Sequence, residues 1–161
     1  QDVRQLWIIA ITLIVFGVLL GVADRFGKKT RDIGDLNVKS GLAFGFGQAM
    51  ALVPGVSRSG GSITVGLLLG FTREAAARYS FLMAIPAVLA AGGYQFAKSF
   101  GDLPSDLVMA TSFATVVSFV SGYVVIAWLL KYLERGSYMP FVAWRILVGL
   151  ALIVLLTTGA V

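Results

Sequence analysis

The sequence contains no cysteine and no histidine, and few of its residues carry a charge. Without these two residue types, disulfide frameworks, zinc sites of the usual ligand spacing, thiol nucleophiles and histidine general bases are excluded. Charged residues make up 13% of the 161 residues and apolar residues 58%, whereas ordinary soluble domains have about 25% and about 45–50%. So few charges could not cover a water-exposed surface, and the composition therefore predicts an integral membrane protein.

The net charge of +5 does not indicate a nucleic-acid partner. The basic residues fall between the apolar runs, and no basic patch interleaved with aromatic residues forms outside them. Their placement is better explained by the orientation of the chain in a bilayer, where membrane lipids are the expected surroundings.

Four apolar stretches are long enough for transmembrane helices, which need roughly 20 residues; they are 7–23, 79–97, 107–130 and 141–159. Two further apolar stretches, 42–53 and 63–71, hold 12 and 9 residues. As helices they would be about 18 and about 14 Å long, too short to cross a hydrocarbon core of about 30 Å. A polar, helix-breaking segment from Pro54 to Ser62 separates them.

These two short stretches form either one broken helix that crosses once or a re-entrant hairpin that enters and leaves on the same side. The positive-inside rule distinguishes the alternatives. A hairpin puts nine basic residues on one side and two on the other, whereas a single crossing gives six against five. We therefore predict an all-α membrane domain over 1–161 with four spans, a re-entrant helical hairpin over 42–71, and both termini on the outer side.

The segment between the hairpin arms offers groups that suit an anion. A helix that begins near Ile63 would supply unpaired N–H groups and a partial positive charge, and Ser57 and Ser59 add hydroxyls. Arg58 is the decisive residue, because an arginine at membrane depth is costly and needs a partner, and its planar fork matches phosphate oxygens. No acidic residue lies between Asp35 and Glu74 to pair with it. The alternative is that Arg58 reaches the interface or caps carbonyl groups of neighbouring helices.

Two other polar residues in apolar segments leave alternatives open. Gln48 either hydrogen-bonds the loop backbone or helps to bind a ligand, and Arg145 is either an interface anchor or part of the site. All eight carboxylates fall in loops or at the ends of apolar segments. We therefore expect neither a general base for Ser57 or Ser59 nor a carboxylate ligand for Mg²⁺ beside them. The chain would carry the anion-binding half of a site, and no metal ligands.

The residues from Gln48 to Gly60 include Pro-Gly-Val-Ser-Arg-Ser-Gly, which resembles the Pro-Gly-x-Ser-Arg-Ser-Gly signature of the bacterial undecaprenyl-diphosphatase family, the bacitracin-resistance proteins. Further similarity appears at Arg73 with Ala76, at residues 79–86, and at Pro140-Phe141 followed by Arg145. The resemblance covers essentially the whole chain. It corresponds to the second part of the family's sequence, so we expect a fragment that lacks the N-terminal half.

The resemblance implies a multi-pass protein of the bacterial plasma membrane that hydrolyses undecaprenyl diphosphate at the outer face and so recycles the lipid carrier of cell-wall synthesis. It also implies two inverted repeats, each with a re-entrant hairpin, of which this chain holds one. The family's glutamate-rich motif lies in the first repeat and is absent here, and a divalent cation (Mg²⁺ or Ca²⁺) would be held by residues outside this chain. The missing half, or a second copy in a homodimer, is the implied partner.

The resemblance also implies roles for individual residues. Arg58 would hold the diphosphate and stabilise charge in the transition state, with Ser57 and Ser59 as hydrogen-bond donors in the catalytic set. The expected substrate-binding residues are Gly55, Gly60, Ser62, Gln48 and Arg145; Ser62 stands where the family usually has threonine.

Two other classes of function remain alternatives. Broken helices and hairpins at the midplane also occur in transporters, so a transporter or flippase for an anionic lipid or phosphate is one alternative. A non-catalytic membrane subunit that needs a partner is the other.

Overall fold

The computed structural model describes residues 2–99 and 105–159, and the regular structure of these residues is helical. Six α-helices and two short 3₁₀ helices follow in the order α1 (Asp2–Phe26), η1 (Ile33–Asp35), α2 (Val38–Ala49), η2 (Met50–Leu52), α3 (Arg58–Leu68), α4 (Arg73–Ser99), α5 (Ser105–Leu133) and α6 (Met139–Thr158). The only β pairing in these residues is one isolated bridge between Arg31 and Phe71. The predicted all-α class is confirmed.

Four helices in the described residues are long and apolar enough to cross a membrane, and they correspond to the four predicted spans. The qualifying segments are Arg4–Phe26, Arg73–Lys98, Leu107–Leu133 and Met139–Thr158. Most helices extend past the predicted ends, because charged residues such as Arg25 and Lys131 continue the last turn, where cations interact favourably with the helix dipole. The apolar side chains of α5 from Leu107 to Val125 are exposed, as expected for a surface that faces lipid.

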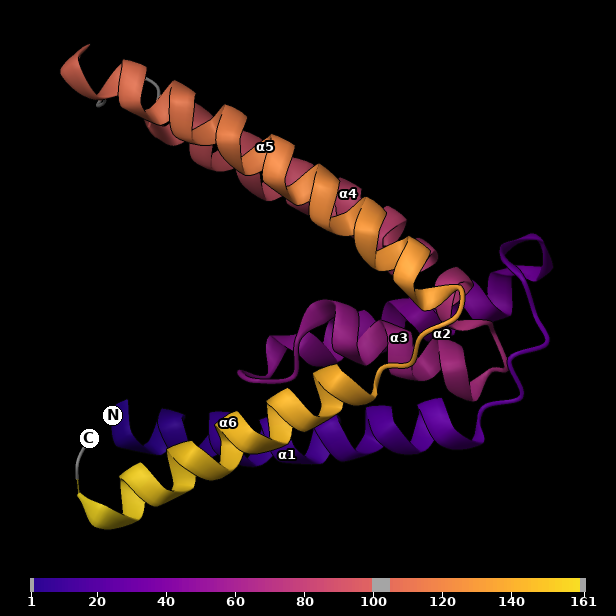
Figure 1. Ribbon diagram of the computed structural model, residues 1–161. Coiled ribbons are helices and arrows are strands. Elements are labelled where there is room, and N and C mark those ends of the chain that lie inside the picture. Colours follow the sequence, from indigo (N-terminus) through magenta and orange to yellow (C-terminus); the bar gives the residue numbers. More distant parts are fainter. Residues whose placement is uncertain (1, 100–104, 160–161) are drawn as a thin grey trace.

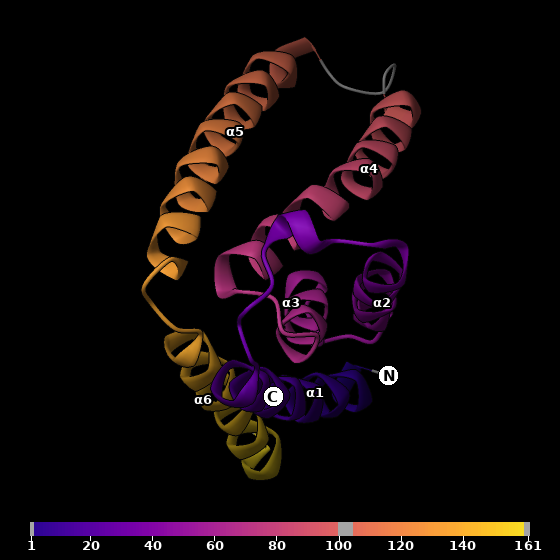
Figure 2. The same ribbon diagram turned by 90° about the vertical axis from the view of Figure 1, so that its right-hand side faces the viewer.

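Helices α2 and α3 form the two antiparallel arms of a hairpin and lie side by side (Figure 2). Their backbones approach closely where Gly47 meets Gly61: a Cβ added to Gly61 would lie 2.3 Å from the carbonyl oxygen of Gly47. Nearer the open end, Phe44 lies against Gly66. The chain therefore turns back after α2, so the two short stretches form a helical hairpin and not one broken helix; its entry and exit on the same side of the membrane stays a prediction.

The two ends of the hairpin meet at one end of the molecule. The backbone N–H groups of Thr30 and Arg31 both donate to the carbonyl of Gly70, at 2.9 and 3.0 Å, and Thr72 donates back to Arg31. The guanidinium of Arg31 also lies 4.3 Å from the ring centre of Phe71. Entry and exit of the hairpin are thus joined directly.

The hairpin packs on an antiparallel pair formed by α1 and α6, while α4 and α5 project away as a second pair (Figure 1). The start of α1 and the end of α6 lie at the same end of the α1–α6 pair, and the loop between α2 and α3 is directed towards that end (Figure 1). The core lies between the hairpin and the first turns of α4, where Phe44 makes edge-to-face contacts with Phe71 and Tyr79. Burial of these rings holds the hairpin in place.

Candidate functional site

The candidate site is the turn that begins α3. Ser57 caps the helix with a φ of 69°, and its hydroxyl accepts a hydrogen bond from the N–H of Gly60 at 3.3 Å. The N–H of Gly61 donates to the Ser57 carbonyl at 3.0 Å. Within the described chain, the N–H groups of Ser57, Arg58 and Ser59 donate no hydrogen bond to protein. A helix start with free N–H groups is a binding site for an anion.

The side chain of Arg58 is exposed, and no hydrogen bond or ion pair joins it to any other described residue. It lines a cavity of about 310 Å³ together with Gln48, Gly45 and Leu52. The hydroxyl oxygens of Ser57 and Ser59 lie 3.5 Å apart in the same turn. The structure therefore brings Gln48 and Arg58 to one cavity at the hairpin tip, with Ser57 and Ser59 in the turn beside Arg58 and the guanidinium without a partner in the described part of the protein.

Gly55 and Gly60 lie where the turn contacts α1 and α6. Gly55 has a φ of +92°, and a Cβ there would lie 2.1 Å from the hydroxyl oxygen of Thr12 on α1. A Cβ on Gly60 would lie 3.1 Å from Nη1 of Arg145. Only glycine meets the first of these requirements without strain. Both glycines therefore act by allowing neighbouring helices to approach the turn.

Thr12 and Arg145 hold three successive carbonyl groups of this turn. The hydroxyl of Thr12 donates to the carbonyl of Pro54 at 2.7 Å. Nη2 of Arg145 donates to the carbonyls of Gly55 and Val56, at 2.9 and 3.0 Å. Arg145 thus contacts the loop backbone. That it also binds a ligand, as the family resemblance implies, stays a prediction.

The turn lies well inside the membrane-spanning part of α1. At 1.5 Å per residue, Thr12 is about 15 Å from the first residue of α1 and about 21 Å from its last. A polar turn at such depth is tolerated where it is enclosed by protein or lines a watery cavity.

Ser62 lies away from this open side. Its side chain is fully buried, and its hydroxyl is 2.6 Å from that of Ser80 on α4. It also donates within its own helix, towards the carbonyls of Arg58 and Ser59. The expectation that Ser62 faces the ligand does not match this position, because the helical twist of α3 turns residue 62 towards α4, where it joins the two helices.

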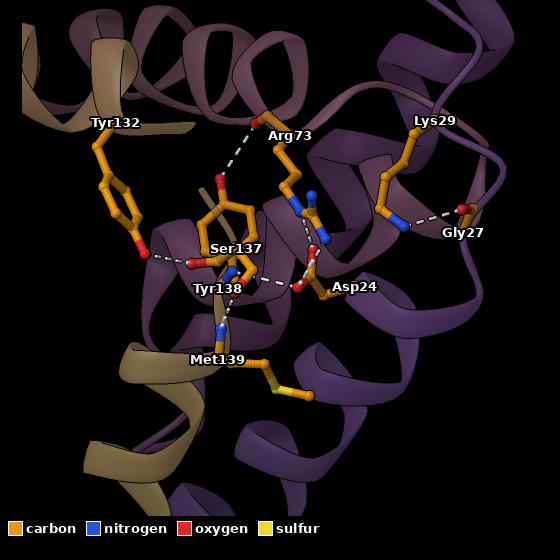
Figure 3. A network of polar contacts seen from close by, with 8 residues as sticks. All are labelled: Asp24, Gly27, Lys29, Arg73, Tyr132, Ser137, Tyr138 and Met139. Carbon is orange, nitrogen blue, oxygen red and sulfur yellow. Dashed lines mark hydrogen bonds and ion pairs between the residues drawn. The ribbon is translucent and has the colours of Figure 1, made fainter. Parts of the chain in front are cut away.

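A second polar cluster lies at the opposite end of α1 (Figure 3). Asp24 is 2% exposed and forms an ion pair with Arg73 through Nε and Nη2. It also accepts the N–H of Tyr138 at 3.2 Å, while the hydroxyl of Tyr138 donates to the carbonyl of Arg73. Asp24 stands at the end of an apolar segment, as the sequence indicates, but partners from distant parts of the chain enclose and bury it.

Each charge in this pair is at the unfavourable end of its helix. Asp24 lies in the last turns of α1, where the helix dipole is negative, and Arg73 begins α4, where it is positive. The ion pair therefore compensates two charges that their own helix dipoles disfavour. Burial, with a further contribution from the charge of Asp24, raises the pKa of Tyr138, whereas Arg73 lowers it. The tyrosine therefore stays protonated and keeps its hydrogen bond.

These features define an all-α multi-pass membrane protein in which a helical hairpin presents a turn with free N–H groups and an arginine without a protein partner among the described residues. Residues 1–151 match the family model described as bacitracin resistance protein BacA, and the chain belongs to this family. The expected family resemblance is confirmed.

Several curated relatives are more than half identical to this chain. An undecaprenyl-diphosphatase of Paenarthrobacter aurescens is 55% identical, over 95% of this chain and 56% of the relative. Undecaprenyl-diphosphatase 2 of Agrobacterium fabrum is 53% identical, over 100% of this chain and 58% of the relative. The chain therefore spans little more than half the length of the curated relatives it matches.

Proposed function

We propose that the turn from Pro54 to Gly60 binds the diphosphate group of undecaprenyl diphosphate. The protein to which this chain contributes would hydrolyse that lipid to undecaprenyl phosphate and inorganic phosphate. The observation that carries this proposal is the unpaired guanidinium of Arg58 beside free N–H groups at the start of α3. The relatives are named for this activity.

In the proposed chemistry the bond between the terminal phosphorus and the bridging oxygen breaks, and undecaprenyl phosphate leaves with the bridging oxygen. A water molecule supplies the new oxygen of the inorganic phosphate, and its two protons are shared between the two products or released to solvent. Arg58 would bind two non-bridging oxygens, and its charge would stabilise the negative charge that develops as the bond breaks. The hydroxyls of Ser57 and Ser59 and the N–H groups of the first turn would donate further hydrogen bonds. Gln48, which lines the same cavity, would contact the diphosphate or the first part of the prenyl chain.

A divalent cation, expected from the family resemblance, does not fit the groups of this chain. Across residues 2–99 and 105–159, no three carboxylates lie close enough to hold a metal ion. Asp24, the buried carboxylate, is bound to Arg73 and Tyr138 at the other end of α1. The proposed steps therefore use only the groups of the turn.

We also propose that the turn opens towards the outer face. The basic loop that includes Lys28, Lys29 and Arg31 would lie in the cytoplasm, and the turn is directed towards the end where α1 begins and α6 ends (Figure 1). Because the chain has no cysteine, Lys28→Cys and Thr157→Cys can be probed singly with an impermeant thiol reagent. Labelling of the two from opposite sides is expected, and labelling from the same side would contradict the orientation.

Phosphate release from undecaprenyl diphosphate by the full-length protein in proteoliposomes tests the function. Arg58→Ala and Arg58→Lys should both lose most of the activity, since lysine keeps the charge but not the planar fork. Arg78→Ala is the matched control, because the exposed Arg78 bonds only weakly, at 3.5 Å, to Glu74. Near wild-type phosphate release by Arg58→Ala would refute the assigned role. Movement of the lipid without hydrolysis would favour a transporter.

A further inference from the structure

We infer that Thr12 and Arg145 are positioning residues that hold the anion-binding turn in its active shape. The inference rests on the proposed function, because it explains how the proposed diphosphate site keeps its geometry. Neither side chain needs to touch the substrate for this role.

The hydrogen bonds that join the turn to α1 and α6 all go to its backbone carbonyl groups. The carbonyls of Pro54, Gly55 and Val56 follow one another, and each accepts a hydrogen bond from α1 or α6. Thr12 is also within reach of two carbonyls of its own helix, at 2.8 and 3.1 Å, but its contact with Pro54, at 2.7 Å, is the shortest. At membrane depth each of these carbonyls would be costly to leave without a donor.

The backbone around these carbonyls has positive φ angles at two residues. Gly55 has a φ of +92°, and Ser57, which has a side chain, has a φ of 69°. Non-glycine residues in this region are strained and persist when the surrounding structure holds them. The conformation of Ser57 matters because it places the hydroxyl on the N–H of Gly60 and leaves the preceding N–H groups for a ligand. The hydrogen bonds to the carbonyls of residues 54–56 thus hold the backbone in the conformation that leaves the N–H groups of Ser57, Arg58 and Ser59 free of hydrogen bonds to other described residues.

The hydrogen bonds of Arg145 in the structure go to the loop backbone. A guanidinium amino group has two N–H bonds, and Nη2 uses its two on the carbonyls of Gly55 and Val56. Nη1 lies beside Gly60, and Nε is buried without a hydrogen-bond partner among the described residues. Nη2 of Arg145 therefore acts through the loop backbone, whereas the guanidinium of Arg58 has no partner in residues 2–99 and 105–159 and is available to a ligand.

The experiment compares Thr12→Val, which removes the hydroxyl and nearly keeps the shape, with Thr12→Ser, which restores the hydroxyl. Thr115→Val is the matched control, because Thr115 makes a similar hydrogen bond of 2.8 Å to a carbonyl of its own helix, far from the turn. Each variant of the full-length protein is measured in nanodiscs by hydrogen exchange of the amides from Val56 to Gly60 and by kcat/KM for undecaprenyl diphosphate.

Thr12→Val should speed exchange in the turn and lower kcat/KM about five- to tenfold, the effect of one neutral hydrogen bond. Thr12→Ser should restore both values, and Thr115→Val should change neither. Arg145→Lys, which cannot reproduce the planar fork, should loosen the same amides.

Unchanged exchange in both Thr12→Val and Arg145→Lys would overturn the inference. So would a loss of kcat/KM in Thr12→Val that Thr12→Ser does not restore. If the wild-type protein releases no phosphate, the proposed function fails, but the exchange data still decide whether Thr12 and Arg145 hold the turn.

Discussion

Removal of the Asp24 carboxylate is expected to be among the most destabilising single changes outside the apolar core. Asp24→Ala leaves the guanidinium of Arg73 and the N–H of Tyr138 without their acceptor. Breaking a fully buried ion pair costs about 3–5 kcal/mol. Because the side chain of Arg73 is 26% exposed and that of Asp24 is 2% exposed, water can solvate part of the released charge, and we expect about 2–4 kcal/mol.

Two further variants bracket this value. Asp24→Asn keeps an acceptor for Tyr138 but loses the charge, so a loss of about 1–2 kcal/mol is expected. Glu74→Gln removes the charge from the pair with Arg78, whose side chains are 32% and 56% exposed. That change should cost less than about 0.5 kcal/mol.

The assay is reversible unfolding in mixed micelles of rising SDS fraction, which gives the free energy of unfolding of each variant relative to the wild type. The expected order of destabilisation is Asp24→Ala, then Asp24→Asn, then Glu74→Gln. If Asp24→Ala cost no more than Glu74→Gln, the contacts between Asp24, Arg73 and Tyr138 would not stabilise the fold, and the reasoning from burial would be wrong.

Two further predictions concern the turn and the tyrosine. Gly55→Ala should abolish most phosphate release, because its Cβ would lie 2.1 Å from the Thr12 hydroxyl at a positive φ. Gly122→Ala, on α5 and with no atom within 4 Å of the added Cβ, should keep it. Since the pKa of Tyr138 is raised in the fold, the unfolded chain ionises first. Stability should therefore fall as the pH rises above about 10, and Tyr138→Phe should lose less over that range; an equal fall in both would contradict the assignment.

The arrangement of the helices was predictable because it depends on length and charge. Stretches of 12 and 9 apolar residues are too short to cross, and the basic residues around them favour entry and exit on one side. That the Arg58 side chain lacks a protein partner within the described chain was predictable for a similar reason. A charge in a Gly- and Ser-rich break between two apolar stretches has few structural explanations.

The buried polar contacts were not predictable, because they join residues far apart in the sequence. Asp24 stands at the end of an apolar run, and nothing in the local pattern indicates that Arg73 and Tyr138 enclose it. Ser62 is buried because α3 turns it towards Ser80. Thr12 is the one hydroxyl residue in the first span, and this isolation is the sequence feature that could have indicated its hydrogen bond to Pro54.

The most direct test of the central claim is equilibrium binding of undecaprenyl diphosphate to the full-length protein in nanodiscs, with and without the Arg58 side chain. A charge-assisted bidentate contact contributes about 1.5–3 kcal/mol, so Arg58→Ala should raise Kd roughly 10- to 100-fold. Arg78→Ala should leave Kd within about twofold, as expected for an exposed pair. An unchanged Kd for Arg58→Ala would contradict the claim that this turn holds the diphosphate.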